Sequence, residues 1–248
     1  HEGHAVRVVP IAPELRPIRA CSKPRSICAL TRNINFWRSL AVSTVLGVNC
    51  ATLAEALLES ELFGYERGAF TSADRAKEGV METADGGTLF LDEVNEMGLG
   101  CQAKLLRALE RREFRRVGGT RKIAVDIHLL AASNADLEAI VESRRFRSDL
   151  YYRLKVVTLT VPPLRDRKDA IPVLAQRFLE DVAREAGLSP RRLTPDALAQ
   201  LARYPWPGNI RELRNCMESL TLTSPREQID VADLPANVRD VPAAPEIR

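Results

Sequence analysis

The chain has 248 residues, of which 45% are hydrophobic and 28% charged, and its formal net charge is +3. This is enough chain for one large domain, or for a core domain with a small lid, and for a sizeable apolar interior. No apolar run reaches the ~18 to 20 residues that a membrane span requires, and no signal peptide is visible, so we expect a cytoplasmic protein without membrane contact.

The cysteines predict neither disulfides nor a structural metal. Five of them are scattered along the chain without a CxxC pair, and only three histidines could join them (Cys21, Cys28, Cys50, Cys101 and Cys216, with His1, His4 and His128). Zinc sites in proteins need four such ligands at short, regular spacings. We therefore expect reduced cysteines that serve as small core residues.

The first segment differs in charge from everything that follows. Residues 1–45 carry seven Lys or Arg and two Glu, a net charge of +5, which leaves −2 for the remaining chain. Four prolines interrupt any long helix there, and no apolar periodicity is present. We predict that residues 1–44 form a basic leader that is disordered or non-native; a shifted reading frame or a rearranged gene start would also produce such a segment.

From residue 45 onward, short apolar runs alternate with helical patterns. Strands are predicted at 45–50, 87–91, 127–132 and 156–161, and helices at 53–63 and 101–111. Apolar strands that alternate with helices predict an α/β fold, with a parallel sheet covered on both faces, over residues 45–167. Ligands of such sheets bind beyond the carboxyl ends of the strands.

A small and purely helical subdomain is predicted over residues 168–239. One helix spans 170–186 and ends at Gly187, a second is capped by Thr194 and continues to about Arg203, and a third begins near Asn209. Residues 240–248 are expected to form a tail.

The segment 62–73 has the composition of an exposed loop. Its glycines permit tight turns, and no periodicity would bury the aromatic side chain of Phe70. An exposed Phe on such a loop indicates a partner-binding tip. The alternative is a loop whose Phe packs back into the core, and composition does not decide between them.

Polar side chains follow the strands at 87–91 and 127–132. Asp92 is placed to hold Mg²⁺ through water, and Glu93 to orient or deprotonate an attacking water. Asn134, at the end of the neighbouring strand, can bind that water or a terminal phosphate. Acids at a helix start and an Asn at a strand end are also common for local electrostatic and turn-forming reasons.

Two arginines six residues apart, Arg147 and Arg153, precede the last predicted strand. A planar, permanently charged guanidinium suits a developing phosphoryl charge supplied by a neighbouring subunit. By spacing alone, an amphipathic helix with solvated arginines is the more ordinary interpretation.

No phosphate-binding loop precedes these carboxylates. Such a loop, the Walker A motif, needs glycines whose N–H groups hold phosphates, followed by Gly-Lys-Ser/Thr. The chain contains no Gly-Lys pair, and its only glycines before residue 60 are Gly3 and Gly47.

Together these segments resemble, over about residues 45–239, the AAA+ domain of bacterial enhancer-binding proteins, which activate sigma-54 RNA polymerase. The family's signature loop, Gly-Ala-Phe-Thr-Gly-Ala, is present as Gly68-Ala69-Phe70-Thr71-Ser72-Ala73. The motifs at 86–93 and 204–213 match the family's Walker B strand and its sensor II segment.

The resemblance implies a role for each matching residue. Asp92 and Glu93 are the Walker B acids, and Asn49 restrains the glutamate until the right nucleotide is bound. Asn134 is sensor I, Arg147 and Arg153 are the arginine-finger pair, Arg211 senses the nucleotide, and Phe70 and Thr71 contact the sigma factor.

The resemblance also implies a mechanism. A ring of about six subunits hydrolyses ATP with Mg²⁺ between protomers and raises these loops to remodel sigma-54 RNA polymerase at promoters. DNA contact is expected to be only indirect, because no helix-turn-helix segment is visible. Ser72 departs from the family's glycine, and without a phosphate loop most of the charge neutralisation that catalyses phosphoryl transfer is missing. Two further interpretations therefore stay open, namely an interaction module that hydrolyses nothing itself and a truncated product without autonomous activity.

Overall fold

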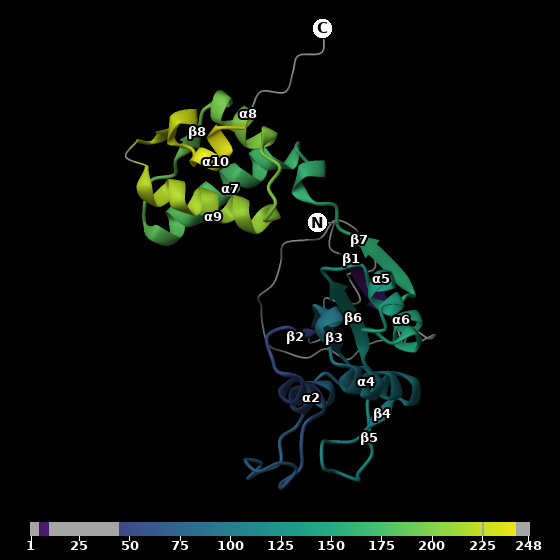
Figure 1. The fold of residues 1–248 in the computed structure, drawn as a ribbon. Helices are drawn as coiled ribbons and strands as arrows, with labels where there is room; N and C mark the ends of the chain where they lie inside the picture. Colours follow the sequence, from purple (N-terminus) through teal and green to yellow (C-terminus); the bar gives the residue numbers. More distant parts are fainter. Residues whose placement is uncertain (1–4, 10–44, 225, 242–248) are drawn as a thin grey trace. The chain divides into compact units, whose positions relative to one another are not determined.

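The structure is a computed structural model that describes residues 5–9, 45–224 and 226–241 (Figure 1). These residues form two compact units that divide at Pro162. The short helix η2 (Leu164–Asp166) belongs to the second unit, since the Leu164 backbone N–H donates to the Asn209 side chain at 2.8 Å. The domain boundary thus lies at Pro162, ahead of the predicted position at residue 168.

A five-stranded sheet forms the centre of the first unit. Its order is β2 (Val45–Asn49), β3 (Thr88–Asp92), β6 (His128–Ser133), β1 (Ala5–Val9) and β7 (Val157–Thr160). Strands β2, β3 and β6 run parallel, in a register that places Asn49 opposite Asp92. The predicted α/β architecture is confirmed, and the predicted strands lie within one or two residues of those observed.

Strand β1 changes the prediction for the leader. Five of the residues expected to be disordered or non-native occupy the sheet between β6 and β7, antiparallel to both. Ala5 lies opposite Ser133, and Val9 lies opposite Leu129. A strand of either direction can pair the free N–H and C=O groups of its neighbours, so an antiparallel segment can occupy this position.

The strand predicted at 156–161 forms as β7, but it is not buried. All four of its residues are exposed, with 46% exposure at both Val157 and Leu159. The reason is its place at the edge of the sheet, where the chain leaves the unit directly afterwards. The prediction of a fully covered parallel sheet fails at this edge.

Helices α2 (Glu55–Phe63) and α4 (Leu99–Arg111) realise the two helices predicted for this unit. The shorter helices α3 (Val80–Thr83), η1 (Val94–Glu96), α5 (Leu137–Glu142) and α6 (Ser148–Leu154) complete it. The apolar face of α4 buries Leu105 and Leu109 in the same cluster as Leu89 and Leu129 of the sheet. Each fully buried Leu contributes about 1.5–3 kcal/mol.

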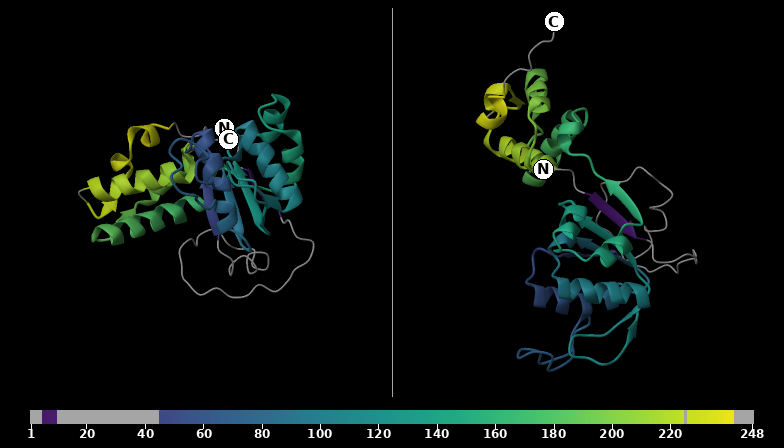
Figure 2. Two further views of the ribbon diagram at one scale, coloured as in Figure 1. Left: turned by 90° about the horizontal axis from the view of Figure 1, so that it is seen from below. Right: turned by 45° about the vertical axis from the view of Figure 1, so that its right-hand side comes forward.

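Two protrusions leave the same end of this unit, beyond α2 and α4 (Figures 1 and 2). One is the segment between α2 and α3, and the other is the hairpin of β4 (Glu113–Phe114) and β5 (Ile123–Ala124). Their bases are joined by backbone pairing, because Tyr65 bridges to Lys77 on one side and to Val117 on the other. The two protrusions are therefore mechanically connected.

The second unit is built around α7 (Ala170–Ala186), α8 (Pro195–Arg203) and α9 (Asn209–Thr223), with η3 (Val231–Asp233) and α10 (Ala236–Arg239). The predicted signals at two helix ends are observed: Gly187 adopts a left-handed conformation after α7, and the Thr194 hydroxyl caps α8. The unit is not purely helical, since β8 (Arg192–Leu193) pairs with β9 (Gln228–Ile229). Strands of two residues are too short to show a periodicity in sequence.

Across the described ranges, no helix combines the length and apolarity needed to cross a membrane.

The base of the first protrusion depends on one backbone crossing, and this generates a prediction. A Cβ atom added at Gly79 would lie 2.3 Å from the Gly64 nitrogen and 2.4 Å from the Leu62 carbonyl oxygen. We expect Gly79→Ala to lower the free energy of unfolding by about 3 kcal/mol, because backbone atoms on both sides must move. Urea denaturation measures this change.

Gly86→Ala is the matched control. Gly86 has a φ of 70° but no atom within 4 Å of an added Cβ, so only the left-handed backbone is penalised, by about 1 to 2 kcal/mol. Equal destabilisation by the two substitutions would show that the crossing does not control stability.

Candidate functional site

The parallel register of β2, β3 and β6 brings four predicted residues together at the carboxyl ends of these strands. Asn49 and Asp92 end their strands opposite one another, and Glu93 and Asn134 are the next residues after β3 and β6. The Asn49 amide donates to the Asp92 carboxylate at 3.3 Å, and the Asn134 amide donates to the Glu93 carboxylate at 3.3 Å. Two carboxylates and two amides thus lie together where a parallel sheet binds ligands.

The contact made by Asn49 differs from the one implied by the resemblance. The family's role for Asn49 is restraint of Glu93, but the recorded hydrogen bond runs to Asp92, and Asn134 is the residue that contacts Glu93. Both bonds are longer than the common hydrogen-bond distance, so each is weak. Asn49 is itself fixed, since its side-chain oxygen accepts from the Ala51 backbone N–H at 2.9 Å.

Glu93 has a strained backbone. Its φ of 52° and ψ of 47° lie in the left-handed region, which non-glycine residues occupy at a cost of about 1–2 kcal/mol. The Asp92 carboxylate accepts from the Glu93 backbone N–H at 3.1 Å and helps to hold this conformation. Strain of this kind is concentrated at functional sites, where it fixes the direction of a side chain.

The residue beneath the cluster is Cys50. Its backbone N–H donates to the Asp92 carbonyl oxygen at 2.9 Å. Burial raises the pKa of the Cys50 thiol to about 12, with a further contribution from the carboxylates of Asp92 and Glu93. The thiol therefore stays neutral at physiological pH and supplies packing, not nucleophilic chemistry.

The arginine pair lies at the two ends of α6, with Arg147 directly before its first residue and Arg153 in its last turn. The Arg147 guanidinium forms an ion pair with Asp149 at 2.7 Å, and this contact holds the pKa of the Asp149 carboxyl below its usual range. Arg153 lies in the last turn and donates to the Leu109 carbonyl oxygen at 3.3 Å. Arg147 is half-exposed, so its guanidinium is accessible from outside the unit.

Gln102 is a positioning residue that the sequence patterns did not identify. It is fully buried on α4, where its amide donates to the Met97 carbonyl oxygen and its oxygen accepts from the Arg147 backbone N–H at 2.9 Å. It thereby fixes the start of α6. The available signal was a polar residue within an apolar helical face, between Cys101 and Leu105.

The predicted partner-binding loop is turned back on itself. The Gly68 backbone N–H donates to the Ala73 carbonyl oxygen, and the Ala73 N–H donates to the Phe70 carbonyl oxygen, both at 2.9 Å. Ala69 is half-buried and Ala73 is buried, whereas Thr71 and Ser72 are exposed. The loop therefore presents its middle residues and anchors its last one.

Phe70 does not return to the core. It is 41% exposed and packs its ring against Tyr65, with ring centroids 4.9 Å apart. Ser72 is not among the described non-glycine residues with positive φ, so the tip does not need a glycine there in this conformation. The aromatic side chain is held by one neighbour and open on its other side.

Arg116 braces the loop from the hairpin. It forms ion pairs with Glu82 at 2.9 Å, Glu66 at 3.3 Å and Glu78 at 3.7 Å, and only 16% of its side chain is exposed. The three carboxylates come from α3 and from both sides of the loop base. One guanidinium thus joins the segments that must move together if the loop moves.

Arg211 belongs to the second unit, in the exposed first turn of α9. The turn before it is strained but well anchored: Trp206 and Asn209 both have positive φ, and the buried Trp206 indole donates to the Leu201 carbonyl oxygen at 2.8 Å. The predicted motif thus forms a rigid entry to the helix that carries Arg211.

The described residues supply only part of a nucleotide site. Asp92, Glu93 and Asn134 are suited to Mg²⁺-bound water and a terminal phosphate, but no group of three or more metal-ligating side chains occurs in the described ranges. A phosphate loop must leave the same sheet edge as Asp92. Strand β1 runs the other way, so its carboxyl end, Val9, lies at the opposite end of the sheet from Asp92. The donor set for a triphosphate does not fit this strand.

Comparison with known proteins agrees with the family that the sequence motifs resemble. Residues 29–160 match the sigma-54 interaction domain, and residues 165–246 match the AAA+ ATPase lid domain. The first match begins ahead of residue 45, so the family's span includes part of the predicted leader.

Three relatives illustrate the similarity. The transcriptional regulatory protein ZraR of Klebsiella oxytoca is 48% identical over 197 residues, covering 79% of this chain and 44% of the relative. The regulatory protein AtoC of Escherichia coli K12 is 47% identical over 210 residues, covering 85% and 46%. The crystal structure of NtrX from Brucella abortus in complex with ATP has a TM-score of 0.74 and 40% identity, covering 84% and 46%. The chain spans less than half the length of each relative.

The brace formed by Arg116 generates a prediction for the loop. We expect Arg116→Ala to lower the free energy of unfolding by about 2 kcal/mol, because three carboxylates lose their shared charged partner. We also expect faster hydrogen exchange at the backbone N–H groups of Tyr65, Glu66 and Val117, which pair the bases of the two protrusions. Denaturation and hydrogen-exchange mass spectrometry measure the two effects.

Arg75→Ala is the control, because Arg75 is exposed on the same protrusion and takes part in none of the ion pairs recorded for the described residues. The brace is disproved if Arg116→Ala leaves exchange at the loop base at the level of this control.

Proposed function

The chain belongs to the sigma-54 interaction domain family, and we propose that it serves in a bacterial transcriptional activator whose loop 68–73 binds the sigma-54 factor of RNA polymerase. The observation that carries the proposal is the half-exposed Phe70 ring beside the exposed Thr71, on a loop that is braced at its base. A fixed aromatic side chain with one open face is the kind of anchor that dominates protein interfaces. Bracing lowers the entropy lost when such a loop binds.

We also propose that the chain works as one member of an oligomeric ring. Arg147 is accessible directly before α6. Asp149 pairs with its guanidinium and Gln102 accepts from its backbone N–H, so it is available to a nucleotide bound by a neighbouring subunit. Asn49, Asp92, Glu93 and Asn134 supply the carboxylate and sensor side of a site in the chain itself. When bound, ATP with Mg²⁺ would supply the energy for remodelling the polymerase complex.

A second candidate function is favoured by the direction of β1. Because the strand in the position next to β6 is antiparallel and the chain has no Gly-Lys pair, the phosphate cradle has no evident source. We propose on this ground that the chain alone does not hydrolyse ATP, and that it contributes its loop and Arg147 to rings containing intact relatives.

Sigma-factor binding tests the first proposal. Titration of fluorescently labelled sigma-54 with the chain should give saturable binding, and Phe70→Ala should weaken it by about tenfold or more, the effect of losing an aromatic anchor. Leu222→Ala is the control, since Leu222 is 59% exposed on the second unit. The proposal fails if the folded chain does not bind, or if both substitutions weaken binding equally.

Nucleotide binding tests the second. We expect a fluorescent ATP analogue with Mg²⁺ to show no saturable binding to the folded chain, because the part of the chain that the structure describes supplies no phosphate loop. Saturable binding that Asp92→Ala weakens would contradict this and would favour a self-sufficient nucleotide site. Circular dichroism establishes that the unchanged chain and the Asp92→Ala variant are both folded.

A further inference from the structure

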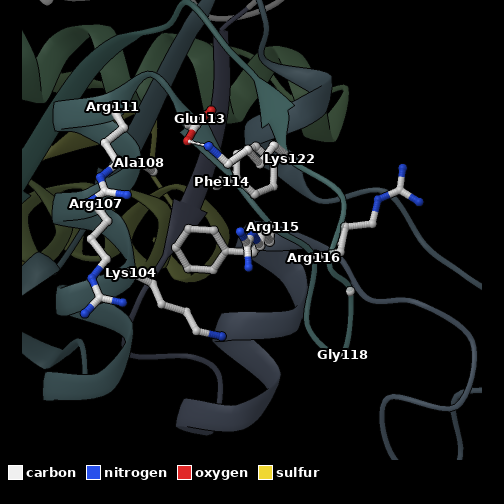
Figure 3. A pocket seen from close by; sticks show the side chains of 12 residues that line it. Lys104, Arg107, Ala108, Arg111, Glu113, Phe114, Arg115, Arg116, Gly118 and Lys122 are labelled. Atoms are coloured by element: carbon white, nitrogen blue, oxygen red, sulfur yellow. Dashed lines mark ion pairs between the residues drawn. The ribbon is translucent and has the colours of Figure 1, made fainter.

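A basic pocket lies between α4 and the β4–β5 hairpin, in a part of the core that the sigma-factor proposal does not use (Figure 3). Its volume is about 430 Å³. Six cationic side chains line it, and Glu113 is the acid among its lining residues; the cations are Lys104, Arg107, Arg111, Arg115, Arg116 and Lys122. Such an excess of one charge in a concave site attracts counter-ions.

Half of these cations already have partners. Lys104 pairs with Glu59, Lys122 pairs with Glu113 at 2.7 Å, and Arg116 is held by its three carboxylates. The ion pairs recorded within the described ranges include none of the other three, Arg107, Arg111 and Arg115.

The three arginines without a recorded ion pair are exposed and line the same pocket. Arg107 and Arg111 are four residues apart on α4, so they share one helix face, and Figure 3 shows Arg115 across the pocket from them, on the hairpin side. Like charges at this spacing destabilise a helix by a few tenths of a kcal/mol in the absence of an anion. The arrangement is therefore a cost to the free protein that a bound anion would remove.

The chemistry of the pocket indicates phosphate. Planar guanidinium groups bind phosphate oxygens in pairs, with better directional match than lysine. From Lys104 to Arg111 the helix rises about 10 Å, which spans about three phosphates of one nucleic-acid strand. A linear polyanion fits this row better than a single small anion.

The burial of the aromatic residues in the pocket argues against two kinds of ligand, namely single-stranded nucleic acid and a protein. Phe63 and Phe114 line it, but they are only 1% and 7% exposed and pack on each other with ring centroids 5.8 Å apart. Neither ring offers a face on which an unpaired base could stack. Neither offers the exposed apolar anchor that a protein partner would normally use.

We propose that this pocket binds the phosphate backbone of duplex DNA without reading its sequence. The sequence patterns assigned no direct DNA contact to the chain. Binding to phosphates needs only the exposed arginines and depends on no base contact. This proposal of DNA binding rests on the pocket alone and does not depend on the sigma-factor proposal.

The position of the pocket gives this binding a use, which rests on the proposed sigma-factor function. Gly118 lines the pocket, and a Cβ added to it would lie 2.8 Å from the Ala69 side chain in the sigma-contact loop. A loop that meets the sigma factor at a promoter brings this pocket close to promoter DNA. Phosphate contacts there would hold the loop in register with the DNA.

The experiment is a fluorescence-anisotropy titration of the whole chain with a labelled duplex of arbitrary sequence, about two helical turns long, at several salt concentrations. We expect the triple substitution Arg107→Gln, Arg111→Gln and Arg115→Gln to weaken binding by about tenfold or more. It should also reduce the slope of log affinity against log salt by about 2 to 3, since each phosphate contact contributes about 0.9.

A matched triple substitution on the second unit removes the same charge elsewhere: Arg192→Gln, Arg214→Gln and Arg226→Gln, all at exposed positions. The proposal is overturned if this control weakens DNA binding as much as the pocket substitutions do, or if neither weakens it. Thermal unfolding of both variants establishes that they are folded. The arginine-to-lysine version of the pocket triple should retain most of the salt slope, because the charges remain.

An acidic polypeptide is the competing ligand. If labelled polyglutamate binds more tightly than the duplex and loses its binding in the pocket triple while DNA binding persists, the pocket serves a protein partner and the proposal is wrong. The assay contains neither sigma factor nor nucleotide, and Phe70→Ala should leave it unchanged. Failure of DNA binding is thereby distinguishable from failure of the sigma-factor proposal.

Discussion

The position of β3 between β2 and β6 is the constraint on which both functional regions depend. Its parallel pairing places Asn49 opposite Asp92, and it brings the end of β6 to the same edge, so the carboxylates and amides meet without any long-range side-chain arrangement. The same strand forms the floor on which α2 and α4 pack. Those two helices precede the loop and the hairpin in the chain, so the position of both protrusions depends on the packing against β3.

Strand β1 satisfies the sheet but cannot supply the chemistry expected at its position. Hydrogen bonding between β6 and β7 requires only an extended segment, and five residues of the leader provide it. Phosphate binding requires in addition that the chain leave the sheet at the edge where Asp92 lies, which an antiparallel strand does not allow. The fold requires only that β1 pair with its neighbours, whereas nucleotide binding also requires that the strand run in the parallel direction. The first requirement can therefore be met without the second.

Much of the architecture could be predicted from the sequence, for identifiable reasons. Thr194 before Pro195, and Gly187 after an amphipathic run, carry strong local signals for the ends of α8 and α7. Apolar runs that end in polar residues predicted the strands and three of the residues at their ends, Asp92, Glu93 and Asn134. The family resemblance was needed for Asn49; it implies restraint of Glu93, whereas in this structure the Asn49 amide donates to Asp92. Which carboxylate an amide contacts depends on shifts in side-chain position that are much smaller than the distance between neighbouring strands.

What the sequence could not predict depends on contacts between distant segments. The exposure of β7 follows from its place in the sheet order, and the pairing of β8 with β9 involves two residues on each side. Gln102 gains its role only when the start of α6 packs against α4. The cations of α4 recur at helical spacing, but those of the hairpin join them in one pocket only when the hairpin folds back onto the helix.

Arg116 and its neighbour Arg115 show how the hairpin can serve two purposes at once. Arg116 is nearly buried among three carboxylates, so its charge is neutralised and its effect is to fix the loop base. Arg115 is exposed on the same strand end and keeps its charge available to solvent. Successive residues of an extended segment face opposite sides. A short β-hairpin can therefore brace the aromatic loop with one arginine and leave the charge of the next one exposed.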